Sequence, residues 1–95
     1  TNAAYASAKT GLGTLAKSVA AEYARDGIAA LGLCPGFVRT EYLDPGSLSA
    51  LSAKTPAGRL TEPREFGDLA ADLVCRDPPL WNGAVITADE GLAAW

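Results

Sequence analysis

A single long helical pattern opens this chain and most constrains what it can fold into. Apolar residues recur at spacings of three and four from Asn2 to about Asp26, where Gly27 predicts a left-handed helix end. At 1.5 Å per residue, such a helix is about 35–40 Å long. A chain of 95 residues supports one small domain with a thin core. We therefore expect a single domain dominated by one helix that is long for its size.

The predicted helix carries an apolar stripe and a run of small residues. Either Thr1 or Asn2 can cap its first free N–H groups. Gly11 and Gly13 lie in its first half, where each costs about 1 kcal/mol relative to alanine. Their presence favours close approach of another helix there, including one from a second subunit. The stripe comprises Ala8, Leu12, Leu15, Ala16, Val19, Ala20 and Tyr23.

Two short apolar runs predict the strands of a parallel sheet. The first, Ile28–Cys34, precedes a turn at Pro35-Gly36, and its length and boundaries favour a strand that is buried on both faces. The second, Ala84–Ala88, follows a turn at Trp81–Gly83. A helix between the two strands would complete a right-handed βαβ unit.

Thr61 predicts the start of that second helix. It offers a threonine cap, and Pro63 stands where a missing N–H does little harm. Residues Glu41–Leu60, before it, show no convincing period, which predicts a lid, a binding loop or a disordered segment with at most one helical turn at Leu48 and Leu51. The helix would bury a stripe of Phe66, Leu69, Ala70, Leu73 and Val74.

Composition excludes several classes of function. The net charge is −3 with both signs scattered, so the chain has neither a basic footprint for nucleic acid nor a polybasic membrane patch. No apolar run is long enough to span a membrane. The absence of histidine excludes imidazole metal sites, and we predict no metal. Cys34 and Cys75 predict reduced core thiols in a cytoplasmic protein.

Tyr5 and Lys9 form the candidate for chemistry. They are four residues apart, so a helix places them on one face. A nearby ammonium favours the phenolate and lowers a tyrosine pKa from its usual value of about 10, toward the range of acid–base catalysis. The alternative is a solvated lysine beside a half-buried ring, and on spacing alone this alternative is the commoner outcome.

The chain resembles the C-terminal part of a short-chain dehydrogenase/reductase. The matching pieces come in the family's order: Tyr5-Ala-Ser-Ala-Lys9, Pro35-Gly-Phe-Val-Arg-Thr40, Thr61-Glu-Pro-Arg-Glu65, and Gly83 through Asp89-Glu-Gly91. The resemblance implies an α/β fold in which residues 1–95 are one partial domain. This domain would be the C-terminal portion of a Rossmann-like, doubly wound parallel sheet, with one helix followed by one βαβ unit.

The resemblance also implies hydride transfer between NAD or NADP and a small alcohol or carbonyl substrate. Tyr5 would be the general acid or base on the substrate oxygen, and Lys9 would lower the tyrosine pKa and bind the nicotinamide ribose. The Glu41–Leu60 loop would be the variable substrate lid. The residues implied to border the cofactor are Tyr5, Lys9, Pro35, Gly36, Val38 and Thr40.

Several family features are missing from the sequence. It has no glycine-rich phosphate turn, and Ser7, inside the tyrosine motif, cannot be the family's catalytic serine. Asp89-Glu90 stands where the family more often has two glycines, and Leu31 where it commonly has asparagine. The chain also lacks methionine at position 1. We therefore expect a fragment of an oxidoreductase that is inactive in isolation.

The alternative is a naturally truncated, non-catalytic module in which Tyr5 and Lys9 are relics. Its open sheet edge would invite pairing, and the small-residue face of the first helix would provide a second contact. Both interpretations predict a homo-oligomer that forms through the 2–26 helix, the open sheet edge or both.

Overall fold

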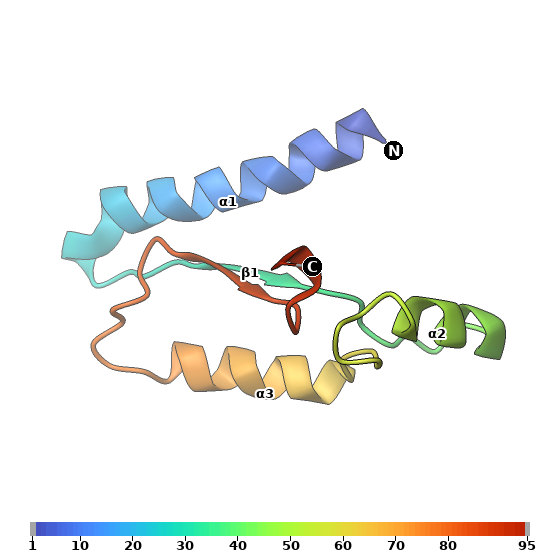
Figure 1. Cartoon of the computed structure of the whole chain (residues 1–95). Helices are drawn as coiled ribbons and strands as arrows, with labels where there is room; N and C mark the ends of the chain where they lie inside the picture. The colour runs from blue at the N-terminus through green and yellow to red at the C-terminus, as the bar shows by residue number, and fades with distance from the viewer. Residues whose placement is uncertain (1, 95) are drawn as a thin grey trace. The chain divides into compact units, whose positions relative to one another are not determined.

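The computed structural model describes residues 2–94 and shows the predicted α/β chain (Figure 1). Strands β1 and β2 pair in parallel as a two-stranded sheet. Within the described range, the chain forms two compact units, residues 2–33 with 76–86 and residues 34–75 with 87–94. The elements are α1 (Ala3–Tyr23), β1 (Gly32–Pro35), α2 (Pro45–Ser52), α3 (Pro63–Val74) and β2 (Val85–Ala88), with 3-10 turns at Ala24–Asp26 and Leu92–Ala94.

Helix α1 begins and ends close to its predicted limits. The Asn2 side-chain oxygen accepts a hydrogen bond from the Tyr5 N–H at 3.1 Å and so caps the first turn. Thr1, the other predicted cap, lies outside the described residues. After Tyr23 the chain makes a 3-10 turn and reaches Gly27, whose φ of 77° gives the predicted left-handed end.

The apolar stripe of α1 is buried only in part. Ala16 and Ala20 are 9% and 6% exposed, whereas Leu12 and Leu15 are 55% and 57% exposed. Ala20 lies close to Gly83, since a Cβ on Gly83 would be 3.3 Å from the Ala20 Cβ. Ala16 and Ala20 therefore pack within the unit, while Leu12 and Leu15 on the same helix remain exposed.

Gly13 approaches a strand, whereas we expected a second helix. A Cβ on Gly13 would lie 3.3 Å from Cγ2 of Val85, the first residue of β2. A Cβ on Gly11 would meet nothing within 4 Å. The branched Val85 side chain thus occupies the space that the missing Gly13 side chain leaves, and the structure gives Gly11 no corresponding contact.

Strand β1 is shorter than predicted and starts later. The expected strand Ile28–Cys34 is replaced by Gly32–Pro35, because the preceding residues face a turn instead of a strand. The Asn82 side-chain oxygen accepts the Ala30 N–H at 2.9 Å, and the Gly83 N–H donates to the Ala30 carbonyl at 2.8 Å. Ladder pairing begins only where the Gly32 N–H donates to the Ala84 carbonyl at 2.9 Å.

Burial on both faces of the first strand was also a wrong expectation. In β1, Gly32 and Leu33 are half-buried, while Cys34 and Pro35 are exposed. Cys34 and Cys75 are free thiols, as predicted, but both are exposed, so neither is a core residue. The physical reason is that the two-stranded sheet offers each strand one neighbour within the described chain.

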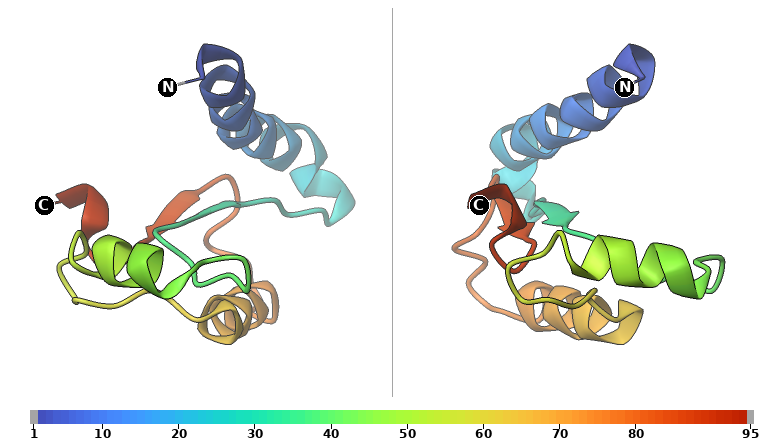
Figure 2. Two further views of the ribbon diagram at one scale, coloured as in Figure 1. Left: turned by 90° about the vertical axis from the view of Figure 1, so that its right-hand side faces the viewer. Right: turned by 45° about the vertical axis from the view of Figure 1, so that its right-hand side comes forward.

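The presumed loop between the strands contains a regular helix. Helix α2 has 8 residues, more than the single turn predicted, because Asp44 caps it. The Asp44 carboxylate accepts the Ser47 N–H at 3.0 Å and the Ser47 hydroxyl at 2.6 Å, and these hydrogen bonds lower its pKa. Figure 2 shows α2 and α3 as separate helices joined by a loop.

The N-cap of helix α3 lies one residue later than predicted. Glu62, rather than Thr61, occupies the cap position, and it forms a capping box with Glu65. Thr61 instead pairs with Val38 in a short parallel bridge. The predicted stripe of α3 is half-buried from Phe66 to Leu73, and Val74 is 65% exposed.

Alanine at the two glycines of α1 should separate helix propensity from close packing. Gly11→Ala should raise the free energy of unfolding by about 0.5–1 kcal/mol, because alanine is the better helix former and the site is open. For Gly13→Ala, the change in the free energy of unfolding should be about 1 kcal/mol less favourable than for Gly11→Ala, because the new Cβ crowds Val85. Urea unfolding measures both, and equal gains would contradict the packing.

Candidate active site

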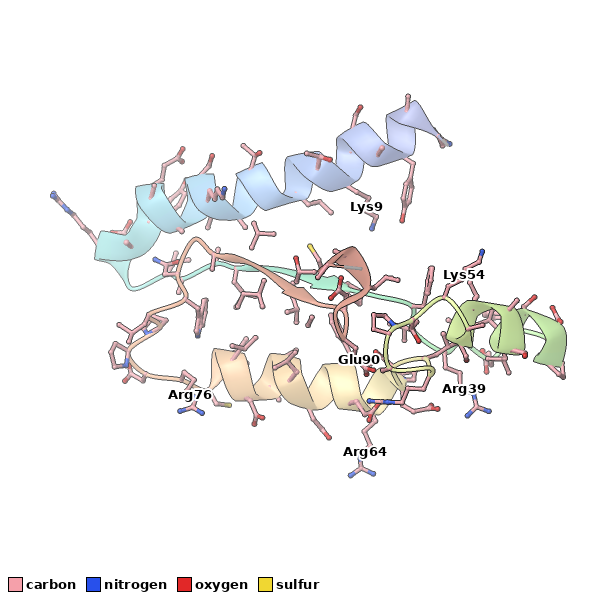
Figure 3. The ribbon with its side chains drawn as sticks, viewed as in Figure 1. Lys9, Arg39, Lys54, Arg64, Arg76 and Glu90 are labelled. Atoms are coloured by element: carbon pink, nitrogen blue, oxygen red, sulfur yellow. The ribbon has the colours of Figure 1, made fainter. Side chains whose placement is uncertain are left out.

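The tyrosine and lysine of the first motif share one face of α1. The Lys9 ammonium lies 5.6 Å from the centroid of the Tyr5 ring, and Figure 3 shows the Lys9 side chain extending from this part of the helix. The Tyr5 residue is 62% exposed. A proton donor and a cation are therefore presented together at the surface of the first unit, as the spacing predicts.

The other predicted site residues belong to the second unit. Pro35 is the last residue of β1 and is exposed, and Gly36 forms the bend that follows it. Val38 is half-buried, whereas Thr40 is exposed and its carbonyl accepts the Leu43 N–H at 3.2 Å. The structure thus gathers these four residues in one short segment and the Tyr5–Lys9 pair on a helix of the other unit.

Gly36 lies against the turn that follows β2. A Cβ at this position would be 3.0 Å from the Asp89 Cβ and 3.1 Å from both the Asp89 Cα and carbonyl oxygen. Two of these three atoms are backbone atoms, which cannot move aside as a flexible side chain can. A residue with a side chain at position 36 would therefore force the two segments apart.

Val38 is held by a residue that the sequence analysis assigned to another role. The Thr61 N–H donates to the Phe37 carbonyl at 3.0 Å, and the Arg39 N–H donates to the Thr61 carbonyl at 2.9 Å. Val38 is thereby bracketed by two hydrogen bonds to a single residue, which is only 9% exposed. The β-branched side chain of Thr61 favours extended structure, although the sequence pattern predicted that Thr61 would cap a helix.

A cluster of charged residues adjoins Thr61. Arg59 forms ion pairs with Glu65 at 2.7 Å and with Glu90 at 2.6 Å, and Arg39 pairs with Glu62 at 3.1 Å. The hydrogen bond from Arg59, followed by that from the Glu62 N–H, lowers the pKa of Glu65. The same contact with Glu65 raises the pKa of Arg59. No local pattern in the sequence predicted these ion pairs, because each joins residues more than one helical turn apart in the chain.

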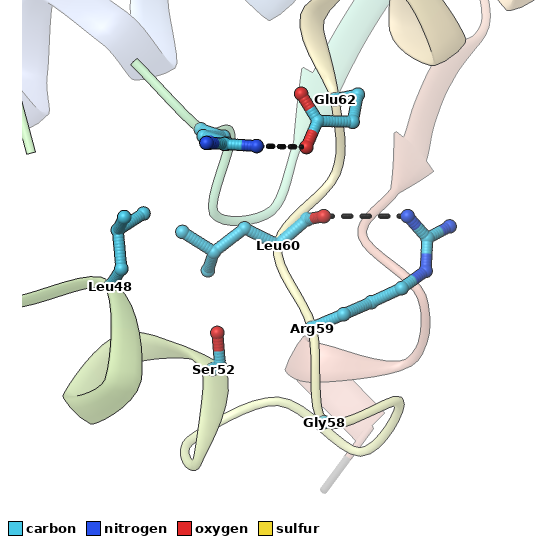
Figure 4. Close-up of a pocket in the computed structure, with 7 residues that line it drawn as sticks. Leu48, Ser52, Gly58, Arg59, Leu60 and Glu62 are labelled. Atoms are coloured by element: carbon cyan, nitrogen blue, oxygen red, sulfur yellow. Dashed lines mark hydrogen bonds and ion pairs between the residues drawn. The ribbon is translucent and has the colours of Figure 1, made fainter. Parts of the chain in front are cut away.

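An open hollow of about 280 Å³ lies beside this cluster (Figure 4). Its apolar part is formed by Leu48 and Leu60, and Leu60 is 7% exposed. Both of its arginines, Arg39 and Arg59, already pair with carboxylates. The hollow therefore presents neutralised charges. Its lining residues are Arg39, Leu48, Ser52, Gly58, Arg59, Leu60 and Glu62.

Among residues 2–94, no group of three or more cysteine and acidic residues is arranged to hold a metal ion. No helix in the same range is both long and apolar enough to cross a membrane.

Comparison with known proteins shows the family to which the chain belongs. Residues 1–93 match the sequence model of a family described as enoyl-(acyl carrier protein) reductase. A tropinone reductase homologue from Arabidopsis thaliana is 38% identical over 93 residues, which cover 93% of this chain and 36% of the relative. The chain thus spans little more than a third of the length of this curated relative.

Solved structures share the fold. A short-chain dehydrogenase family protein from Francisella tularensis gives a TM-score of 0.87 at 22% identity, over 99% of this chain and 45% of that one. At that identity the likeness concerns the fold alone. ElxO, solved with NADP bound, gives a TM-score of 0.83 at 28% identity, over 96% of this chain and 39% of that one.

Adding one methyl group at Gly36 should destabilise the second unit. Gly36→Ala should lower the free energy of unfolding by about 1–3 kcal/mol, because the Cβ would clash with the Asp89 backbone. Gly67→Ala is the matched control, since Gly67 lies in α3 with nothing within 4 Å of its Cβ position. The control should gain up to about 1 kcal/mol. Losses of similar size in both, measured in urea, would disprove the close contact.

Proposed function

Because this chain belongs to the enoyl-(acyl carrier protein) reductase family of short-chain dehydrogenases/reductases, we propose that it supplies the proton-transfer part of an NAD(P)-dependent oxidoreductase. The observation that carries the proposal is the exposed phenol of Tyr5 with the Lys9 ammonium 5.6 Å from its ring. The reaction interconverts a small alcohol and a carbonyl compound.

The side chains present fit the nicotinamide half of such a cofactor. Lys9 offers an ammonium and Thr40 an exposed hydroxyl, both suited to the hydroxyl and amide groups of a nicotinamide riboside. The sequence contains no glycine-rich phosphate turn to hold the pyrophosphate. We therefore assign to this chain the nicotinamide contacts of Tyr5, Lys9, Pro35, Gly36, Val38 and Thr40.

Proton transfer is the contribution of this chain's own residues. A nicotinamide cofactor supplies a hydride to the carbonyl carbon in reduction and accepts one in oxidation. In reduction, Tyr5 donates its phenolic proton to the substrate oxygen as negative charge develops there. Lys9 stabilises the phenolate that remains. In oxidation, the same phenolate removes the proton of the alcohol.

The setting of this reaction is the cytoplasm. Both thiols are free in the structure, and a reducing compartment keeps such thiols reduced.

A chimaera tests this function. Residues 1–95 replace the matching C-terminal part of ElxO, so that ElxO supplies the upstream part. The chimaera should bind NADPH and reduce carbonyl compounds, while the 95-residue chain alone should not. Tyr5→Phe should lower kcat by about 10²–10⁴-fold, because it removes the proton donor. NADPH oxidation, followed by absorbance, measures both.

Ser7→Ala is the control for this experiment. Ser7 lies inside the same motif but has no role in the proposed reaction, so its loss should leave kcat unchanged. Full activity in Tyr5→Phe, or NADPH-dependent reduction by the 95-residue chain alone, would refute the proposal.

A second function, as an oligomerising module, is favoured by the exposed side of α1. Tyr5, Leu12 and Leu15 are 62%, 55% and 57% exposed, and their spacing places them on neighbouring turns of one helix side. An exposed apolar strip of this kind marks an association surface. Among residues 2–94, β1 and β2 pair only with each other, so their outer edges offer a further surface. The partner proposed in both cases is a second copy of this chain.

Acidic substitutions on this strip should dissociate the oligomer. We expect the wild-type chain to be a dimer or larger at tens of micromolar, and Leu12→Glu with Leu15→Glu to be monomeric, because buried charges are costly. Thr14→Glu adds one negative charge on another face of α1 and should leave the oligomer intact. Sedimentation velocity distinguishes these states, and a monomeric wild type would exclude the module.

A further inference from the structure

Glu90 has an unusual backbone conformation. Its φ of 55° makes it the one non-glycine residue of the described range with positive φ. Residues with side chains rarely adopt this conformation unless surrounding contacts hold them there. Figure 3 labels Glu90 near the first turn of α3. Its carboxylate must therefore be considered together with the residues that precede this helix.

One carboxylate oxygen of Glu90 accepts from two donors. The Thr61 hydroxyl donates to it at 3.3 Å, and the Arg59 guanidinium pairs with it at 2.6 Å. The Glu90 side chain is 27% exposed, against 49% for Arg59. Thr61 is 9% exposed. Of the two contacts, the one with Thr61 thus joins Glu90 to a buried residue.

Thr61 also bonds, through its backbone, to the segment that contains Val38. Its N–H and carbonyl bond the backbone on either side of Val38, at 3.0 Å and 2.9 Å. The neighbouring residue of the same turn, Asp89, lies directly against Gly36. The Asp89-Glu90 turn therefore contacts this segment directly at Gly36. It is also linked to the segment near Val38 by the hydrogen bond between Glu90 and Thr61.

We propose that Glu90 is a positioning residue, which fixes the segment Gly36–Thr40 through the hydroxyl of Thr61. This inference rests on the proposed function, in which that segment borders the nicotinamide. Glu90 itself touches neither cofactor nor substrate in this scheme. The hydrogen bond to Thr61 is the positioning contact, and the ion pair with Arg59 is secondary to it.

Amide hydrogen exchange on the full 95-residue chain, measured by NMR at the Arg39 and Thr61 N–H groups, tests the proposal. Glu90→Gly removes the carboxylate and suits the positive φ, so it should leave the backbone turn relaxed. Exchange at both amides should nevertheless become about 10-fold faster, because local opening is no longer opposed by the Thr61 contact.

Glu90→Gln distinguishes positioning from a general charge effect. Its side-chain oxygen still accepts the Thr61 hydroxyl, so exchange should return to nearly the wild-type rate although the ion pair is lost. Glu65→Gln is the matched control. It removes the charge of the other Arg59 partner and keeps a capping-box acceptor, so it should leave both amides unchanged.

Three results would overturn the proposal. These are wild-type exchange in Glu90→Gly, exchange in Glu90→Gln as fast as in Glu90→Gly, or equally fast exchange in Glu65→Gln.

If Glu90→Gly does not fold, Thr61→Val removes the same hydrogen bond, and it should speed exchange at Arg39 to the same extent. Wild-type exchange at Arg39 in Thr61→Val would also reject it. No cofactor enters these measurements, so their outcome is separate from that of the chimaera.

Discussion

Close approach to Val85 is the constraint on which the first unit depends. A Cβ on Gly13 would lie 3.3 Å from one Val85 methyl group, and a Cβ on Gly32 would lie 3.4 Å from the same group. Helix α1 and strand β1 therefore approach β2 closely at two positions that lack a side chain. The packing costs helix propensity at Gly13, and van der Waals contact with the branched Val85 side chain opposes that cost. This arrangement holds the helix that presents Tyr5 and Lys9.

The second unit is organised differently, by hydrogen bonds and paired charges. Thr61 brackets Val38 through its backbone, while Arg59 joins Glu65 to Glu90. Exposed ion pairs of this kind contribute little singly, so the hydrogen bonds of Thr61 are the contacts that determine the geometry around Val38. The Tyr5–Lys9 pair, to which we assign the proposed proton transfer, thus lies on a helix of the first unit, and the Gly36–Thr40 segment lies in the second.

Elements with strong local signals were predicted well. Thr61 and Pro63 marked the start of α3, with the cap predicted to within a residue, because capping acts over one helical turn. The left-handed end at Gly27 was predicted for the same reason. Helix α2 was underestimated, since its evidence was mainly the Asp44 cap followed by Pro45. The residues around α2 show no helical period, so the cap alone did not predict a helix of this length.

By itself, the sequence determined the α/β pattern, the family and the placing of Tyr5 and Lys9 on one helix face, because each depends on residue type and local spacing. Only the tertiary structure decided that β1 begins at Gly32, since the Asn82 side-chain oxygen and the Gly83 N–H, more than fifty positions away, bond the N–H and the carbonyl of Ala30. It also decided that Thr61 pairs with Val38 and contacts Glu90. Such contacts join residues distant along the chain, and no local pattern specifies which distant partner a polar group will find.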